Sequence, residues 1–267
     1  MIKRGVIFFI LSFLFNTSVF AIRETVVNYT VIPEANGLSG VPKDSYSKTL
    51  VGGFHNLMQE LLKDTNISIN FIGYDSYFSA LENTTVYSSI SNPEIMLGAT
   101  FSENYTKYLD YVSVPIFNDT LVLVANKKSI PEKFNFTDDF DGDIKKLSPV
   151  FCGVKGINIP YLKNTKLDEY KTIDSAFEEV FLNNKILIAP KTLVDKYMEK
   201  NSGSVKLKNL KVIVYKNFPI YYFFVINKKS SLFTTKFDED NFITDILFKR
   251  LQEMIDKDEI TKIIEQK

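Results

Sequence analysis

Runs typical of β-strands alternate with apolar stripes at helical spacing along most of this chain of 267 residues. The first half has a β-rich run at 25–29, a helical stripe at 54–62 and a strand-like alternation at 66–71. The second half repeats this order, with a strand at 150–154 and a helical stripe at 176–181. Strands that alternate with helices favour parallel sheets covered on both faces, and the length suits two α/β units of about a hundred residues each.

Two segments far apart in the chain resemble each other. Residues 120–129 and residues 221–230 are each a continuous apolar strand that ends in Asn-Lys-Lys-Ser. A separate strand is predicted at 210–214, just before the second of them. Two similar strands on either side of the middle of the chain suit a lobe inserted into another lobe, with the chain crossing between the lobes twice. In a chain rich in lysine and asparagine, coincidence is the alternative.

The start of the chain predicts a cleaved export signal. Two basic residues precede an almost wholly apolar stretch at 6–15, and Val19-Phe20-Ala21 places small residues before a cleavage point. The apolar stretch is too short for a comfortable membrane span, although an uncleaved anchor is the alternative. Residue 22 is Ile rather than Cys, so no lipid anchor is indicated. We therefore expect residues 1–21 to be removed and the remainder to be a soluble protein of the periplasm.

Scarce residue types exclude several kinds of chemistry. With a single histidine, His55, the chain cannot build a multi-histidine metal site. With a single cysteine, Cys152, it cannot form an internal disulfide. Any Ser-His-Asp mechanism would have to use His55, which we interpret as a partly exposed helix residue. After removal of the signal, arginine remains only at Arg23 and Arg250. The 32 basic and 32 acidic residues balance, which gives no electrostatic footprint for nucleic acid. We expect no cofactor and no metal, and we interpret Cys152 as a buried strand residue rather than a reactive thiol.

The segment 93–117 carries the most specific pattern in the chain. A buried strand leads into Gly98-Ala-Thr-Phe-Ser102, a polar turn follows, and Asp110-Tyr-Val-Ser-Val-Pro115 precedes the first of the two similar apolar strands. This stretch resembles the signature of bacterial extracellular solute-binding proteins of family 3, the amino-acid-type receptors of ABC importers. Weaker motifs in the family's order extend the resemblance over essentially all of residues 25–267: Gly53-Phe54 at the first long helix, Tyr74-Asp75, and Gly153-Val-Lys-Gly156 at the start of the second lobe.

The resemblance implies an α/β fold of a defined kind. This is the two-lobed periplasmic-binding-protein clamshell of type II, in which one lobe is inserted into the other and two crossover strands join them. After a signal peptide at 1–21, lobe 1 would comprise residues 22–116 and 222–267, and lobe 2 residues 117–221. The implied partners are a small-molecule ligand in the interlobe cleft and the membrane subunits of an ABC transporter. We expect a monomer that binds no nucleic acid.

The anchors for an amino acid are altered in the implied cleft. Gly98 and Thr100 match positions whose backbone and hydroxyl bind the ligand carboxylate in the family. Tyr105 stands where the family has an arginine that forks onto that carboxylate, and a lysine elsewhere cannot reproduce the fork. The family's acidic partner for an amino group falls on or next to Lys191, for which a solvated surface position is the alternative. The implied ligand is a small polar or aromatic-containing solute, not a standard α-amino acid bound in the usual way.

Three further positions complete the predicted site. Tyr74 matches an aromatic residue that stacks on the ligand in the family, and Tyr29 lies at the end of the first strand, where the family also lines its cleft. Gly156 could offer backbone N–H groups at a helix start, which suit an anion. The alternatives are ordinary packing for the two tyrosines and a tight turn for the glycine. The predicted ligand-binding set is Tyr29, Tyr74, Gly98, Thr100, Tyr105, Gly156 and Lys191.

Three functions fit these observations. The first is a periplasmic receptor that captures its solute for an ABC importer. The second is a degenerate clamshell that acts as a sensor or as a partner of an envelope protein without transport, and the loss of both charged anchors supports it. The third is a clamshell-derived enzyme that uses Asp75, Glu103 or His55 in acid/base steps. Neither carboxylate has a recognisable partner at a diagnostic spacing, and we interpret His55 as a partly exposed helix residue. We expect the chain not to be an enzyme.

Overall fold

The computed structural model describes residues 25–31, 41–42, 50–86, 92–131, 134, 137, 139–147 and 150–265. The predicted signal peptide and Arg23 lie outside these residues. Among the residues described, no helix is both long and apolar enough to cross a membrane. The helices are α1 (Gly53–Leu62), α2 (Tyr77–Thr85), α3 (Phe140–Lys145), α4 (Ile173–Asn183), α5 (Lys191–Lys200), α6 (Ile243–Asp256) and α7 (Ile260–Glu265). The strands are β1 (Thr25–Val31), β2 (Val41–Pro42), β3 (Leu50–Val51), β4 (Ile67–Gly73), β5 (Ile95–Thr100), β6 (Leu109–Tyr111), β7 (Phe117–Asn126), β8 (Phe151–Val154), β9 (Leu167–Tyr170), β10 (Ile186–Pro190) and β11 (Leu210–Asn227).

One large sheet connects most of the strands. Its order is β4-β1-β5-β11-β7-β10-β8-β9, and β6 also pairs with β11. Parallel pairs stand at both ends, where β1 lies between β4 and β5, and β8 lies between β9 and β10. β5, β6 and β7 pair antiparallel to β11, and β10 pairs antiparallel to β7. The predicted parallel α/β units are confirmed, and antiparallel strands join them in the middle of the sheet.

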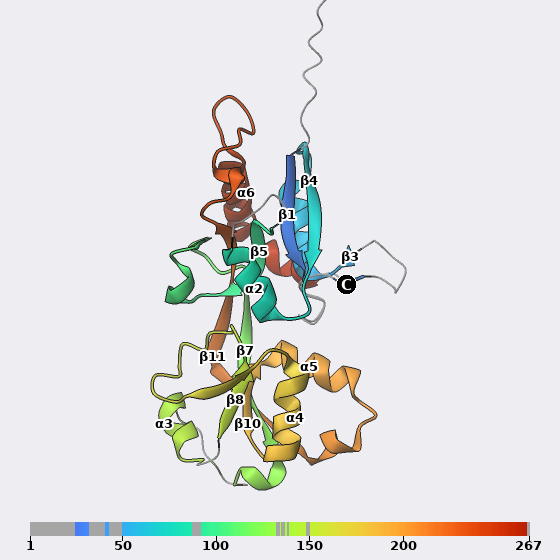
Figure 1. Ribbon diagram of the computed structural model, residues 1–267, viewed down its shortest axis with the longest axis vertical. Coiled ribbons are helices and arrows are strands. Elements are labelled where there is room, and N and C mark those ends of the chain that lie inside the picture. Colours follow the sequence, from blue (N-terminus) through green and yellow to red (C-terminus); the bar gives the residue numbers. More distant parts are fainter. Residues whose placement is uncertain are drawn as a thin grey trace, which may run out of the picture.

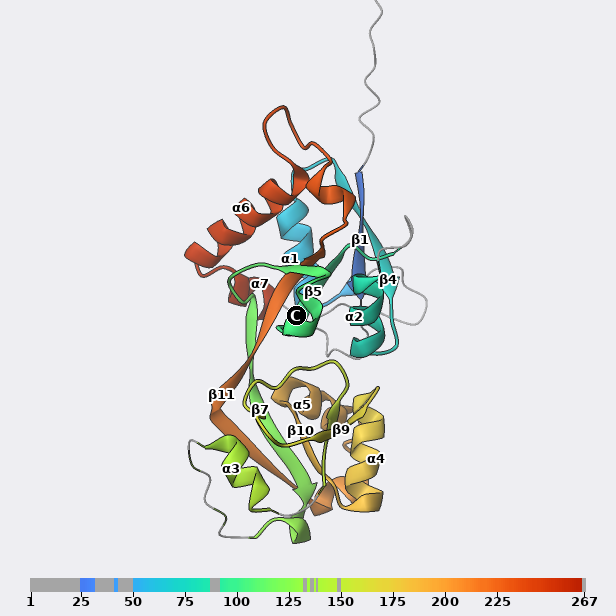
Figure 2. The ribbon, with the colours of Figure 1, turned by 60° about the vertical axis from the view of Figure 1, so that its left-hand side comes forward.

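β7 and β11 run between two groups of elements (Figure 1). The group that we call lobe 1 contains β1, β4 and β5 with α1, α2, α6 and α7, and lobe 2 contains β8, β9 and β10 with α3, α4 and α5 (Figures 1 and 2). The chain enters lobe 2 along β7 and returns along β11, so lobe 2 is inserted into lobe 1. Phe117 and Tyr222 are partners in the ladder between β7 and β11. The proposed lobe boundaries at 116/117 and 221/222 therefore lie side by side.

β11 differs from the sequence pattern, which predicts a strand at 210–214 and another from 221 onward. The structure has one strand from Leu210 to Asn227. Its register against β7 shifts between Tyr215 and Pro219, so residues 216–218 form a bulge. Pro219 directly follows these residues. Proline has no N–H for a ladder hydrogen bond, and a bulge is one of the few places in a sheet that accept it. The break in the apolar pattern is therefore a bulge within one strand and not a loop between two.

Both faces of the sheet are buried in hydrophobic clusters. Along β7, Leu121, Leu123 and Ala125 belong to the first cluster, and Val122 and Val124 belong to the second. Side chains of α1, α3, α6 and α7 complete the first cluster, and side chains of α2, α4 and α5 complete the second. A strand that is buried on both faces has no polar alternation, which explains the unbroken apolar run of β7 in the sequence.

Cys152 lies on β8 and is fully buried in the second cluster. Burial raises the pKa of its thiol to about 12, so the sulfur is uncharged at neutral pH. A thiol that is both buried and protonated is a poor nucleophile. The interpretation of Cys152 as a buried strand residue is confirmed.

Candidate binding site between the lobes

The two lobes meet where the chain leaves β8. Residues 155–158, which we call the interlobe turn, lie against the end of β5. The backbone N–H of Asn158 donates to Thr100 Oγ1 at 2.9 Å, and Asn158 Nδ2 donates to the carbonyl oxygen of Phe101 at 2.7 Å. Thr100 Oγ1 also lies 3.5 Å from the carbonyl oxygen of Gly156. Two predicted site residues, Thr100 and Gly156, are therefore brought together from opposite lobes.

Tyr77, which is outside the predicted set, completes this contact. Its hydroxyl oxygen accepts the backbone N–H of Thr100 at 2.7 Å and lies 3.3 Å from Thr100 Oγ1. Burial raises the pKa of Tyr77, so the phenol stays neutral. The Ser76 side chain caps α2 by accepting the N–H of Ser79, which sets where the helix begins and which residue faces β5. This local cap could have located the start of α2 in the sequence, but not its neighbour on β5.

Gly98 and Gly156 both have left-handed backbones, with φ of 87°. At Gly98, a Cβ atom would lie 2.4 Å from Cε2 of Phe54, because the Phe54 ring of α1 lies directly against the backbone of β5 at this glycine. At Gly156, a Cβ atom would lie 3.3 Å from Cδ1 of Tyr77, on the other side of the lobe interface. The left-handed backbone and the lack of room for a Cβ atom thus both favour glycine at these positions. Their contact with a ligand remains a prediction.

Tyr29 and Tyr74 differ in their surroundings. Tyr29 is 0% exposed in the first hydrophobic cluster, and its ring packs edge-on against Phe71 with 6.1 Å between the ring centroids. Tyr74 is half-buried against the second cluster, and burial raises the pKa of its hydroxyl. Ordinary packing, the alternative interpretation, accounts for the position of Tyr29. Tyr74 is the more accessible of the two rings. Stacking of Tyr74 on a ligand and a cleft-lining role for Tyr29 remain predictions.

Tyr105 and Lys191, which stand at the altered anchor positions, contact other side chains of their own lobes. The Tyr105 hydroxyl donates to Glu82 Oε1 on α2 at 3.1 Å, and burial together with this carboxylate raises the pKa of Tyr105 to about 12. Lys191 is the first residue of α5, and its Nζ pairs with Asp195 one turn further along the same helix. The Lys191 side chain is 43% exposed, as at an ordinary solvated position. A ligand that uses Lys191 would therefore compete with Asp195.

A buried carboxylate, Asp119 of β7, stands beside the start of α5. It is 8% exposed and accepts the backbone N–H of Thr192 at 3.0 Å and that of Thr120 at 2.6 Å. Pro190, the residue before α5, provides no side-chain cap, so Asp119 caps this helix from a neighbouring strand. Burial raises the pKa of Asp119, and hydrogen bonds from Thr192 and Thr120 act in the opposite direction. No local pattern reveals this cap, because Asp119 and Thr192 are 73 residues apart.

Arg250 has a structural role in lobe 1. Its Nη1 donates to the carbonyl oxygen of Leu61 at 2.9 Å and also to that of Lys63, at the end of α1. A cation there satisfies carbonyl groups that have no partner within the helix and complements the helix dipole. Arg250 therefore ties α6 to α1, and it is not part of the contact between the lobes.

The expectation for His55 was wrong, because this residue is buried rather than partly exposed. Its side chain is 3% exposed, and its ring lies 4.9 Å from the Phe71 ring of β4, centroid to centroid. Within the described part of the chain, Nδ1 of His55 has no hydrogen-bond partner. The helix α1 packs on the sheet and also against α6 and α7, so its buried surface is wider than the apolar stripe indicates.

We expect lobe 1 to lose stability in mild acid because of His55. Burial lowers the pKa of His55, so the unfolded chain takes up this proton more readily than the folded chain. The stability that the neutral, buried imidazole contributes is fully present above the pKa of the unfolded state, about 6.5. It is lost as the pH falls through the lower pKa of the folded state. Urea unfolding at pH 7.5 and pH 5.0 measures this loss, and a His55→Gln variant should show a smaller difference between the two pH values. Equal differences in both proteins would contradict the prediction.

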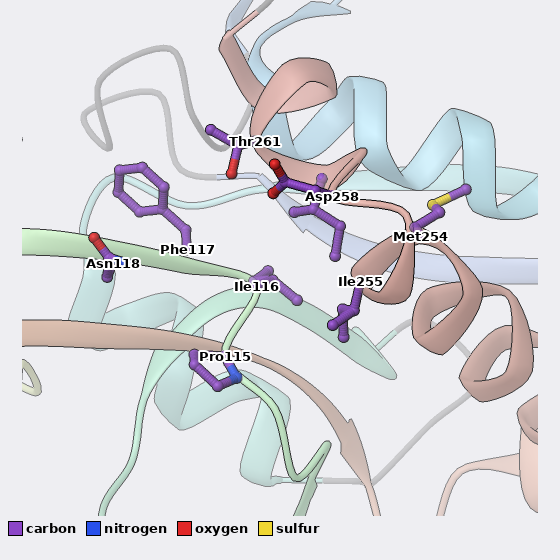
Figure 3. A pocket seen from close by; sticks show the side chains of 9 residues that line it. Pro115, Ile116, Phe117, Asn118, Met254, Ile255, Asp258 and Thr261 are labelled. Atoms are coloured by element: carbon purple, nitrogen blue, oxygen red, sulfur yellow. The ribbon is translucent and has the colours of Figure 1, made fainter.

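A separate cavity of about 310 Å³ lies in lobe 1 where β7 begins. Pro115, Ile116, Phe117 and Asn118 form one side of it, and the corner between α6 and α7 forms the other. Figure 3 shows Asp258 and Thr261 at this corner, among the side chains that line the cavity. No residue of the predicted ligand-binding set lines this cavity.

Similar proteins are found among solved structures and not by sequence. No family model and no curated sequence matches this chain. An ancestral arginine-binding protein bound to glutamine superposes with a TM-score of 0.62 at 16% sequence identity, over 89% of this chain and 95% of that one. A binding component of an ABC transporter from Wolinella succinogenes complexed with lysine has a TM-score of 0.62 at 16% identity, over 90% and 94% of the chains. A histidine kinase sensor domain with similarity to periplasmic binding proteins has a TM-score of 0.62 at 13% identity, over 90% and 93%.

These similarities define the class of fold. The chain has the two-lobed α/β clamshell fold of periplasmic binding proteins, as the sequence predicted. The similar structures include amino-acid receptors and a sensor domain, so the fold is shared by proteins with more than one role.

Proposed function

We propose that this chain is an exported solute-binding receptor that captures a small polar or aromatic-containing molecule between its lobes for an ABC importer. The observation that carries the proposal is the meeting of Thr100 from lobe 1 with the interlobe turn from lobe 2. A solute held there contacts both lobes, and its extra contacts favour the joined arrangement. The small amino-acid ligands named for two similar structures support a small polar solute.

The proposed ligand-binding residues include those of this meeting point and those predicted from the sequence. Tyr77 and Asn158 join the set predicted from the sequence, because both bind the polar groups of Thr100. The altered anchors support a solute other than a zwitterionic amino acid held by an arginine fork, since Tyr105 is uncharged and Arg250 caps α1. The full proposed set is Tyr29, Tyr74, Tyr77, Gly98, Thr100, Tyr105, Gly156, Asn158 and Lys191.

Thermal unfolding against a metabolite panel tests the proposal, with native mass spectrometry of protein purified from its own periplasm to find a retained solute. A solute at a hundred times its dissociation constant adds about 2.7 kcal/mol to the free energy of unfolding. For a solute found in this way, we expect Thr100→Val to weaken binding about ten-fold, because one hydroxyl partner is lost. Thr234→Val, which removes an exposed hydroxyl of lobe 1, is the matched control and should leave the affinity unchanged. The absence of any retained solute and of any thermal shift would contradict the receptor role.

A second candidate function is a sensor or envelope-protein partner that does not take part in transport. It is favoured by the similarity to a histidine kinase sensor domain and by the fact that the chain's own groups join the lobes. Such a partner would bind the joined shape of the two lobes. A stable complex with a membrane receptor whose affinity ignores every small molecule in the panel would favour this role over transport.

A further inference from the structure

The interlobe turn contacts lobe 1 at three neighbouring points. Asn158 donates two hydrogen bonds to the end of β5, one to Thr100 Oγ1 and one to the Phe101 carbonyl. Lys155 Nζ lies over the Phe78 ring of α2, 3.8 Å from its centroid, which is a favourable cation–π distance. Between them, Gly156 lies close to the Tyr77 ring, and a Cβ atom added to this glycine would lie 3.3 Å from Cδ1 of Tyr77. Three of the four residues of the interlobe turn thus contact lobe 1.

The polar groups at the end of β5 are satisfied by the chain itself. The N–H of Thr100 donates to the Tyr77 hydroxyl, and Oγ1 of Thr100 accepts from Asn158. The carbonyl oxygen of Thr100 lies 3.4 Å from the Tyr111 hydroxyl, and the carbonyl oxygen of Phe101 accepts Asn158 Nδ2. A solute that binds these groups therefore replaces hydrogen bonds that already exist, and it gains only the difference between the two sets.

We propose that the interlobe turn is a latch that holds the two lobes together without a solute. The inference rests on the proposed function only for the role of the solute, because the latch itself consists of contacts within the chain. A partner that recognises joined lobes would then bind the solute-free protein as well. A solute that enters through separated lobes binds with an affinity reduced by the fraction of molecules that are open.

Distances between two spin labels across the lobes measure the latch directly. The labels are placed at Asn83→Cys on α2 and Lys171→Cys after β9, two exposed positions in opposite lobes. Cys152 is buried and protonated, so it does not take up a label in the folded protein. The protein is unfolded and refolded first to remove any retained solute. We expect one short, narrow distance population in this solute-free protein.

Variants of the latch should shift this population. Asn158 has an exposed side chain, so Asn158→Ala removes one interlobe hydrogen bond without a cost to folding, and the ratio of joined to separated lobes should fall about five-fold. In this variant the amide of residue 158 still faces Thr100 Oγ1, so its hydrogen exchange should become about five-fold faster. The double variant Thr100→Val/Asn158→Ala removes both interlobe hydrogen bonds of Asn158 and the 3.5 Å contact of Thr100 Oγ1 with the Gly156 carbonyl oxygen, and it should lower the ratio about a hundred-fold. Asn201→Ala, which removes an equivalent bond to the Tyr197 carbonyl within lobe 2, is the matched control and should change neither measurement.

Two results would overturn the latch. One is a long-distance population that dominates the solute-free wild-type protein. The other is an Asn158→Ala variant whose distances and whose residue-158 exchange rate both equal those of the wild type. Neither measurement needs a solute, so failure of the latch and failure of the receptor role, which the metabolite panel tests, are distinguishable.

Discussion

Replacing Gly98 by alanine should lower the free energy of unfolding by about 3 kcal/mol. Two costs add at this position. The backbone is left-handed, with φ of 87°, which disfavours any residue with a Cβ atom. The new methyl group would also lie 2.4 Å from Cε2 of Phe54, and the Phe54 ring is buried with little room to move.

Urea unfolding of the variant and the wild type measures the loss at Gly98. Gly73→Ala is the matched control, because Gly73 lies at the end of β4 with no heavy atom within 4 Å of the added Cβ and with φ outside the left-handed region. Gly98→Ala in a Phe54→Leu background separates the two costs, because the shorter side chain removes part of the overlap and none of the backbone strain. Equal stability of the Gly98 and Gly73 variants would show that neither cost is present.

Replacing Asp119 by alanine should lower the free energy of unfolding by about 2 kcal/mol. The carboxylate is the only described side chain that caps the start of α5, and its loss leaves the partly buried N–H groups of Thr192 and Thr120 without this acceptor. Asp119→Asn keeps an oxygen acceptor and should retain part of the stability. We therefore expect the free energy of unfolding to increase in the order alanine, asparagine, aspartate at position 119.

Asp195→Ala in the same helix is the control for Asp119. Asp195 is 54% exposed and pairs with Lys191 one turn away, and exposed pairs of this kind contribute about 0.3–0.5 kcal/mol. Urea unfolding compares the two alanine variants. A loss at Asp119 no greater than the loss at Asp195 would contradict the capping role.

The sequence predicted the fold class because its signals are local and repeated. The apolar runs of β7 and β11 show no polar alternation since both faces of the sheet are covered, and they mark the two crossings between lobes. The alternation of strands with helical stripes predicted the parallel pairs of both lobes. The continuity of β11 could not be predicted, because the bulge at 216–218 interrupts the apolar pattern as a loop would.

The site was predicted only in part, since its contacts join residues that are far apart in the chain. Thr100 and Gly156 were expected near a ligand, and the structure brings them together. The contacts of Tyr77 and Asn158 with Thr100 depend on how α2 and lobe 2 are placed against β5, and no periodicity encodes that placement. His55 was expected to be partly exposed because the stripe on α1 shows only the face toward the sheet, while α6 and α7 cover a second face.

The bulge in β11 has a consequence for the geometry of the whole clamshell. On both sides of residues 216–218 the path of β11 is fixed by its pairing with β7, and Phe218 within the bulge packs on Phe140 of α3 with 5.3 Å between the ring centroids. An inserted residue increases the local twist of a strand. We therefore expect the number of residues between Tyr215 and Pro219 to influence the angle at which lobe 2 faces lobe 1, and we expect homologues with a bulge of different length to present their two lobes at a different angle.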